Sequence, residues 1–434
     1  MDRSSDCFVG LRSLPSGSFG GFMALAFILS AVAATPRSMA APSNEAFDED
    51  LNAYRKTEAT GLVAQLNQRL ALRQATLSLD DQHGYLPSLL RELQIPPSSQ
   101  MLVASKTSPN RHFISPKNPR ALYYNDQAAV AYVPGAPLLE VAASDPKLGA
   151  VFYTLDQKLS AQPRLVRDDR CLECHASVKT LNIPGFLVRS FRTEDDGEVD
   201  LLSGKVVTHR TPLAERWGGY YVTGTHGDQT HLGNLFGPDA HTRHEKDPRV
   251  NGNITNLATF LQTRNFLGAG SDIVALLVFD HQEQMENLLT RLSYETIAAQ
   301  HRGDDLRPTY PAAEAVLKYL LFTDEAILTA PVQGTSTFAQ WFESNGPKDG
   351  AGRSLRQLDL QTRLFKFPCS YLIYSPSFQG LPAGAKLHLW RRLAQILAGE
   401  DKSPDFQKIP PQTKQAIQQI LTETHPDLPA FWRL

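Results

Sequence analysis

Residues 120–155, RALYYNDQAAVAYVPGAPLLEVAASDPKLGAVFYTL, decide the fold class of this chain. Short apolar runs are separated there by Asn-Asp, Pro-Gly and Asp-Pro breaks, which is typical of strands joined by tight turns. The runs cover residues 121–124, 129–133, 138–141 and 151–155. A second stretch of the same texture follows over residues 186–191, 206–207 and 219–223. We therefore expect two antiparallel strand-rich blocks.

The segments on either side of these blocks have helical periodicity. Before them, Leu62, Leu66 and Leu70 recur at helical spacing within a helix expected over residues 45–79. After them, helices are expected over residues 282–299 and 386–398, each with one apolar stripe. The predicted class is α+β: an antiparallel strand-rich core, a helix at its N-terminal side and a helical C-terminal part.

The first forty residues have the pattern of a secretory signal peptide. Arg3 and Arg12 precede an apolar run over residues 22–34, and small-residue cleavage sites follow. This run is shorter than the roughly 20 residues that a transmembrane helix needs. We expect an exported, periplasmic protein whose mature chain has no transmembrane span. The predicted regions are a signal peptide over 1–40, an N-terminal helical region over 41–115, a strand-rich region over 116–250 and a mainly helical region over 251–434.

The charge and cysteine counts exclude other classes. The chain has 43 basic and 45 acidic residues, so its formal net charge of -2 provides no basic surface for nucleic acid. Four cysteines are too few for a disulfide-built fold of this size, and Cys7 lies within the expected signal peptide. The remaining cysteines must be explained by local chemistry.

Cys171-Leu172-Glu173-Cys174-His175 is the motif that carries this chemistry. Two thiols at this spacing can add to the two vinyl groups of one haem, and the adjacent His175 then binds the iron as axial ligand. Covalent attachment needs an oxidising, extracytoplasmic route, and the expected signal peptide agrees with that. The motif predicts one covalently attached haem c, held by Cys171, Cys174 and His175, in the strand-rich region.

Three other interpretations of the cysteine pair compete with haem. A zinc site would need His226 and His231, or His241 and His244, which lie far downstream of Cys174. A thioredoxin-like redox pair would need a βαβ context that the pattern does not show. A structural disulfide is the third. Cys369 lies in an apolar run and is expected to be a packed core residue.

The second axial ligand of the iron is open to several candidates. His209, His226 and His231 lie near a segment rich in glycine and aromatic residues, and we favour this cluster for the distal side. Met285 is a further candidate, although it belongs to an apolar helix stripe and is better explained as a core residue. His281 precedes it by one turn. Candidate partners of the haem propionates are Arg189, Arg210 and Arg216.

The chain also resembles a family of exported bacterial proteins that carry a single c-type haem, the cytochrome c domain-containing family. The matching stretches are LGAVFYTL (148–155), CLECHAS (171–177), PGFLVRS (184–190), RWGGYYVTGTHG (216–227), 272–291 and 368–378. The resemblance implies haem attachment at Cys171, Cys174 and His175. Relatives often have Met at the position of Leu232 and His at that of Glu286, so a ligand or relay there would be missing here. Strand-rich blocks around a haem also resemble haem-containing PAS-type sensory domains.

Three functions remain open at this stage. The leading one is electron transfer to or from a redox partner protein, with His175 and a second strong ligand on the iron. The alternatives are a haem oxidoreductase, for example peroxidase-like, and a haem-based redox or gas sensor, both with an open distal site.

Overall fold

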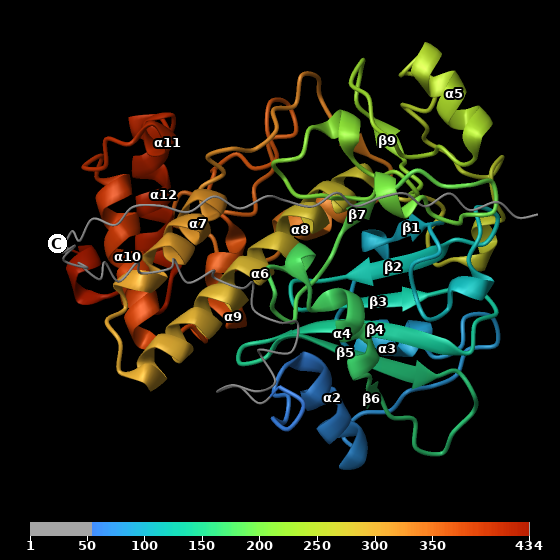
Figure 1. The fold of residues 1–434 in the computed structure, drawn as a ribbon, viewed down its shortest axis with the longest axis horizontal. Coiled ribbons are helices and arrows are strands. Elements are labelled where there is room, and N and C mark those ends of the chain that lie inside the picture. The colour runs from blue at the N-terminus through green and yellow to red at the C-terminus, as the bar shows by residue number, and fades with distance from the viewer. Residues whose placement is uncertain (1–53, 434) are drawn as a thin grey trace, which may run out of the picture. The chain divides into compact units, whose positions relative to one another are not determined.

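A six-stranded antiparallel sheet is the largest strand assembly in the computed structural model, which describes residues 54–433 (Figure 1). Each strand pairs with its neighbour in sequence, so the sheet is a meander in the order β1 to β6. The predicted strands of residues 120–155 are confirmed. The strands are β1 Met101–Val103, β2 Arg120–Tyr124, β3 Ala128–Tyr132, β4 Leu138–Asp145, β5 Gly149–Asp156 and β6 Val166–Arg167.

The sheet buries one face against the N-terminal helices α2 (Leu62–Ala71) and α3 (Leu86–Glu92). Val130, Val141 and Val151 face this side and share one apolar core with the buried leucines of both helices. On the opposite face, Tyr124 lies in a second core, together with α6. Since side chains alternate along a strand, the same strands support both cores.

Helix α6 (Ile273–Arg302) contributes many of the buried side chains of this second core. Its N-cap is Asp272, whose side chain accepts hydrogen bonds from the backbone amides of Val274 and Ala275, and it ends at Gly303 in the left-handed region, with φ of 70°. The helix was expected only over 282–299. It starts earlier because the first turns, from Ile273 to Phe279, are apolar on all sides and fully buried.

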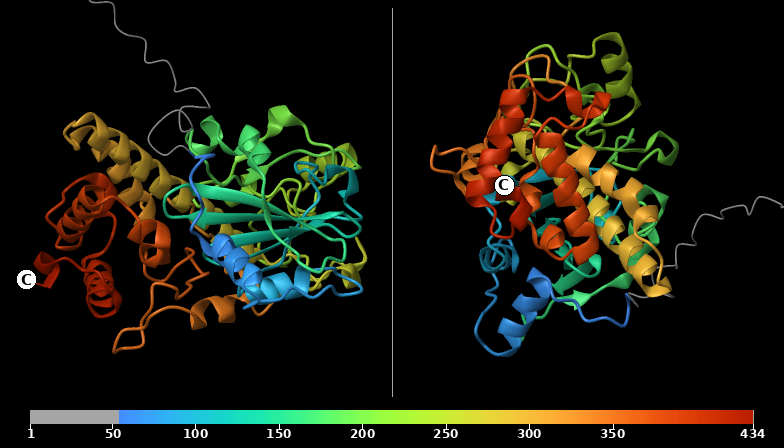
Figure 2. Two further views of the ribbon diagram at one scale, coloured as in Figure 1. Left: turned by 90° about the horizontal axis from the view of Figure 1, so that it is seen from below. Right: turned by 90° about the vertical axis from the view of Figure 1, so that its left-hand side faces the viewer.

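Helices α7 (Tyr310–Leu320), α10 (Ala383–Leu397) and α12 (Pro411–Thr424) pack together at one end of α6, and the sheet lies towards its other end (Figures 1 and 2). Their core includes Trp390 of α10, Ile417 of α12 and Leu317 of α7. The helical C-terminal part and the mixed class are thus confirmed. The helices are α7 Tyr310–Leu320, α8 Phe338–Ser344, α9 Pro376–Gln379, α10 Ala383–Leu397, α11 Pro404–Gln407 and α12 Pro411–Thr424.

The expected second strand-rich block is wrong in extent. It contains two-stranded ribbons and isolated bridges, such as the one between Tyr220 and Val103 of β1, and the segments 186–191 and 219–223 are mostly irregular. Trp217 and Gly219 have φ of 67° and 84°, which are turn rather than strand conformations. The ribbons pair β7 Arg189–Ser190 with β8 Lys205–Val206, and β9 Gly224–Thr225 with β10 Gln333–Gly334.

The described residues include only part of the N-terminal segments for which the sequence predicts a signal peptide and a long helix. In the described chain, α2 is much shorter than the helix expected over 45–79, because Arg73 turns left-handed just after it, with φ of 57°. Residues 45–53 and the expected signal peptide lie outside the described residues. Within residues 54–433, no helix has both the length and the apolar character needed to cross a membrane.

Candidate functional site

The cysteine motif is presented on one short helical turn after β6. Asp168 accepts a hydrogen bond from the backbone amide of Arg170 and begins the 3-10 turn Asp169–Cys171, which leads directly into helix α4, Leu172–His175. Leu172 is buried in the core beneath the turn. The short turn therefore anchors its apolar residue and keeps Cys174 on the surface.

Both thiols of the motif are free in this structure. Cys174 is exposed and Cys171 is half-buried. Burial, with smaller effects from the carboxylates of Asp168 and Glu140, raises the pKa of Cys171 to about 12. The disulfide considered from the sequence is not formed, and both sulfur atoms are available for covalent attachment.

His175 is held by two hydrogen bonds to one residue. Its Nδ1 lies 2.9 Å from the carbonyl oxygen of Gly185, and its own carbonyl oxygen accepts a 2.9 Å bond from the amide of Gly185. A carbonyl oxygen can only accept, so Nδ1 carries the proton. Burial lowers the pKa of His175 to about 4, which keeps the ring neutral. Nε2 therefore presents a lone pair, and no hydrogen bond from a described residue reaches it.

The sheet face next to His175 is only partly covered. The ring of His175 packs against Phe152 of β5, with 4.6 Å between centroids. Thr154 lies two residues further along the same face of β5 and is opposite Glu140 of β4. Glu140 is in turn opposite Ala131, and both Thr154 and Glu140 are only partly buried. The motif thus borders a partly open part of the sheet that carries the hydroxyl of Thr154 and the carboxylate of Glu140.

Apolar side chains close to Cys174 are exposed. Val178, three residues after His175, is 69% exposed. Leu202 is 99% exposed and belongs to the 3-10 turn Leu201–Ser203. The next residue, Gly204, lies against the guanidinium of Arg189, and Arg189 in turn interacts electrostatically with Cys174. Exposed apolar side chains beside an open thiol are what a large flat apolar ligand would cover.

Two arginines near the motif have an unused donor. The Nε atoms of Arg120 and Arg189 are buried and have no hydrogen-bond partner. Arg120 has its Nη1 3.7 Å from Glu140, and its positive charge also helps to lower the pKa of His175. Arg189 stacks over Phe191 at 4.1 Å, and its pKa is lowered by burial. An anionic ligand beside His175 would find two cationic partners.

Arg189 was predicted from the sequence, whereas Arg120 was missed. Arg120 is the first residue of β2, and its position beside the motif depends on strand register rather than on any local pattern. The other two predicted arginines have different roles. Arg216 is committed to Asp280 at 3.1 Å and to two backbone carbonyls, and Arg210 lies on the surface 3.9 Å from Asp324.

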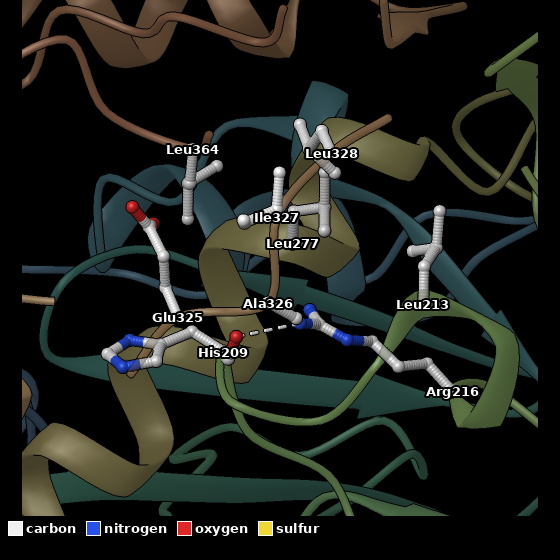
Figure 3. A pocket seen from close by; sticks show the side chains of 9 residues that line it. All are labelled: His209, Leu213, Arg216, Leu277, Glu325, Ala326, Ile327, Leu328 and Leu364. Carbon is white, nitrogen blue, oxygen red and sulfur yellow. Dashed lines mark hydrogen bonds between the residues drawn. The ribbon is translucent and has the colours of Figure 1, made fainter. Parts of the chain in front are cut away.

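The side chain of His209 is buried. Its ring stacks on Tyr319 at 3.8 Å, and its Nδ1 lies 2.8 Å from Nδ1 of His281. Its Nε2 is buried with no partner. Figure 3 shows His209 beside Glu325 in a small cavity, with its carbonyl oxygen bound by Arg216. No hydrogen bond or ring contact joins His209 to His175 in the described chain.

His226 and His231 form a separate buried pair, with ring centroids 4.9 Å apart. Nε2 of His226 accepts from the amide of Asn253, and Nδ1 of His231 accepts from the amide of Gly233. His209, expected in the same cluster, makes no hydrogen bond or ring contact with either in residues 54–433. Neither ring contacts His175, so their distal role stays a prediction.

Met285 is fully buried in the apolar core around α6. His281, on the same helix, donates to or accepts from Ser370 through Nε2 at 2.7 Å and is therefore fully engaged on both ring nitrogens. The distal assignment of Met285 likewise stays a prediction.

Other metal chemistry finds little support in this part of the chain. Over residues 54–433, no group of three or more His, Cys, Asp or Glu side chains is arranged to hold a metal ion. The zinc site considered from the sequence is therefore not assembled there.

Comparisons with known proteins found no match to this chain. The chain matches no family model, no curated protein and no solved structure. The chemistry of the site has to be argued from its own residues.

Proposed function

We propose that this protein carries one haem, attached covalently through Cys171 and Cys174 and ligated by His175, and that it transfers single electrons. The observation that carries the proposal is the state of His175. Its Nδ1 is bound to a backbone carbonyl, no hydrogen bond from residues 54–433 reaches its Nε2, and it lies on the same helical turn as two free thiols. A ligating histidine needs this tautomer, with the second nitrogen held by a hydrogen bond.

The surrounding residues fit the rest of a haem. The two cysteines supply the thioether links, and Phe152, whose ring packs against His175, supplies an apolar contact on the sheet. Arg120 and Arg189 would bind the propionates, since each is a partly buried cation whose charge interacts with a residue of the motif, Arg120 with His175 and Arg189 with Cys174. When bound, the haem supplies a one-electron iron couple, whose potential the protein sets through the ligands and their surroundings.

The same proposal includes location and partner. Thioether formation requires an extracytoplasmic, oxidising route, which is consistent with the signal-peptide pattern over residues 1–40 and a periplasmic site of action. The exposed thiol of Cys174 would place one edge of the haem at the surface, where a redox partner protein could reach it. The resemblance to the cytochrome c domain-containing family and the PAS-like character of the core belong to this proposal too.

The first test asks whether haem is covalently bound. The full chain would be produced in a host that exports it and attaches haem to c-type cytochromes. We expect haem to remain with the chain on a denaturing gel and to add the mass of one haem. Cys171→Ser and Cys174→Ser should each leave at most one thioether link. Cys369→Ala is the matched control, because this cysteine is buried elsewhere, and it should keep the full mass.

Release of all haem from the wild-type protein on denaturation would refute the proposal. The ferric absorption spectrum then separates electron transfer from the alternatives. A low-spin spectrum that cyanide does not readily change indicates a second strong ligand, as an electron carrier needs. A high-spin spectrum that changes on cyanide binding would favour the haem oxidoreductase or the sensor.

A further inference from the structure

Asn287 of helix α6 binds the backbone of a segment that leads to the motif. Its Oδ1 accepts a 2.8 Å bond from the amide of Phe186, and its Nδ2 donates a 2.9 Å bond to the carbonyl oxygen of the same residue. Asn287 is 2% exposed. One buried side-chain amide thus satisfies both backbone groups of Phe186 in the way that a neighbouring strand would.

The segment Pro184–Phe186 is held from two sides. The carbonyl oxygen of Pro184 accepts a 2.9 Å bond from the amide of Ala150 in β5, opposite the contact with α6. Gly185, between the two bonded residues, has no room for a side chain. A Cβ there would lie 2.5 Å from Oδ1 of Asn287 and 2.9 Å from Cδ1 of Ile183. The peptide of Gly185 is therefore fixed against both the sheet and the helix.

This peptide is the one that holds His175. Its carbonyl oxygen accepts from Nδ1 of His175 and its amide donates to the carbonyl oxygen of His175, both at 2.9 Å. We propose that Asn287 is a positioning residue for His175, acting through the Gly185 peptide to fix the tautomer and direction of the imidazole. The proposal rests on the proposed haem function and names a residue that controls the same site.

The physical consequence concerns the strength of the axial ligand. A hydrogen bond from Nδ1 to a fixed carbonyl makes the imidazole a better donor at Nε2 and favours ferric iron. Without Asn287, the Gly185 carbonyl can move, and this bond lengthens or breaks. The reduction potential should therefore rise. A tenfold change in the relative affinity of the two iron states for His175 corresponds to about 59 mV for a one-electron couple.

The experiment compares Asn287→Ala and the smaller change Asn287→Ser with Gln100→Ala. Gln100 is a matched control because it is also a buried amide, 3% exposed, that binds the backbone of a distant segment. Its Nε2 donates to the carbonyl oxygens of Gly268 and Gly270, at 2.8 and 2.7 Å, and neither contacts His175. All three variants remove a buried amide, so each should lose stability.

Two measurements separate positioning from stability. The first is the midpoint potential of the haem-loaded full chain, which should rise in both Asn287 variants and stay at the wild-type value in Gln100→Ala. The second is the tautomer of His175 in the haem-free full chain, read from its nitrogen chemical shifts. We expect the Nδ1-protonated form in wild type and in Gln100→Ala, and a mixture of tautomers in the Asn287 variants.

Both Asn287 variants with the wild-type potential and the wild-type tautomer would overturn the inference. A wild-type protein without covalent haem would instead refute the proposed function, while the tautomer measurement would still test the role of Asn287. If Asn287→Ala does not fold, Asn287→Ser decides the outcome by the same two measurements.

Discussion

Gly185→Ala should disturb the site while leaving the three proposed haem-binding residues, Cys171, Cys174 and His175, unchanged. The added Cβ would lie 2.5 Å from Oδ1 of Asn287, 2.9 Å from Cδ1 of Ile183 and 3.0 Å from Cβ of Thr180. All three atoms belong to buried side chains around the segment, so the strain cannot be relieved by a flexible surface group. The Gly185 peptide must shift instead.

The expected loss in the free energy of unfolding of Gly185→Ala has two contributions. Overpacking by one methyl group in a filled core costs about 1–3 kcal/mol. Weakening one of the buried hydrogen bonds of the segment adds about 0.5–1.5 kcal/mol. We expect the free energy of unfolding to fall by about 1.5–4.5 kcal/mol, as the sum of these terms. Urea unfolding followed by tryptophan fluorescence measures this difference, and the His175 tautomer should change in the same direction as in the Asn287 variants.

Gly350→Ala is the control for the substitution itself. Its Cβ would meet only Oε2 of Glu423, at 3.3 Å, at the end of a side chain that can move. The change should alter the free energy of unfolding by less than about 1 kcal/mol. Equal stability of Gly185→Ala and wild type, with an unchanged tautomer, would refute the close packing of the segment and with it the argument for its rigidity.

Two further predictions concern buried groups of α6. Burial raises the pKa of Glu286 to about 7, so the folded state favours its protonated form, and the stability from this group is lost as pH rises through about 7. The free energy of unfolding of the wild-type protein should fall between pH 5 and pH 9, and Glu286→Gln should reduce this fall by up to about 3 kcal/mol. An unchanged pH profile in the variant would contradict the raised pKa of Glu286. Met285→Leu keeps the core volume and should cost less than about 1.5 kcal/mol, with the ferric spectrum unchanged. A low-spin to high-spin change in this variant alone would identify Met285 as the distal ligand.

Local patterns predicted the parts of the fold that depend on local contacts. The strands over residues 120–155 were predictable because apolar runs and turn residues alternate at strand length. The second block failed for a physical reason. Phe186 has its backbone groups satisfied by the side chain of Asn287, which lies far along the chain, so no neighbouring strand is needed. A sequence pattern cannot show that a distant amide replaces a strand.

Some residues of the candidate site could likewise be predicted from the local sequence, and others could not. Cys171, Cys174 and His175 could be found from five adjacent residues. Arg120 could not, because only the register of the sheet places its buried guanidinium near His175. The histidines expected on the distal side share a sequence neighbourhood, yet His209 pairs with His281 of α6, whereas His226 pairs with His231. Proximity in sequence was a poor guide because irregular segments turn sharply around glycines.

Helix α6 explains why a large domain surrounds a five-residue motif. The proposed haem attachment requires only the two thiols and the histidine, and these lie on one short turn that by itself would leave the imidazole free to rotate. The fixed carbonyl that holds Nδ1 comes from Gly185, and the support for Gly185 comes from Asn287 and from Ala150 of the sheet. The orientation of His175 thus depends on how α6 packs against the sheet, so changes in that packing would reach the iron of the proposed haem through a short chain of hydrogen bonds.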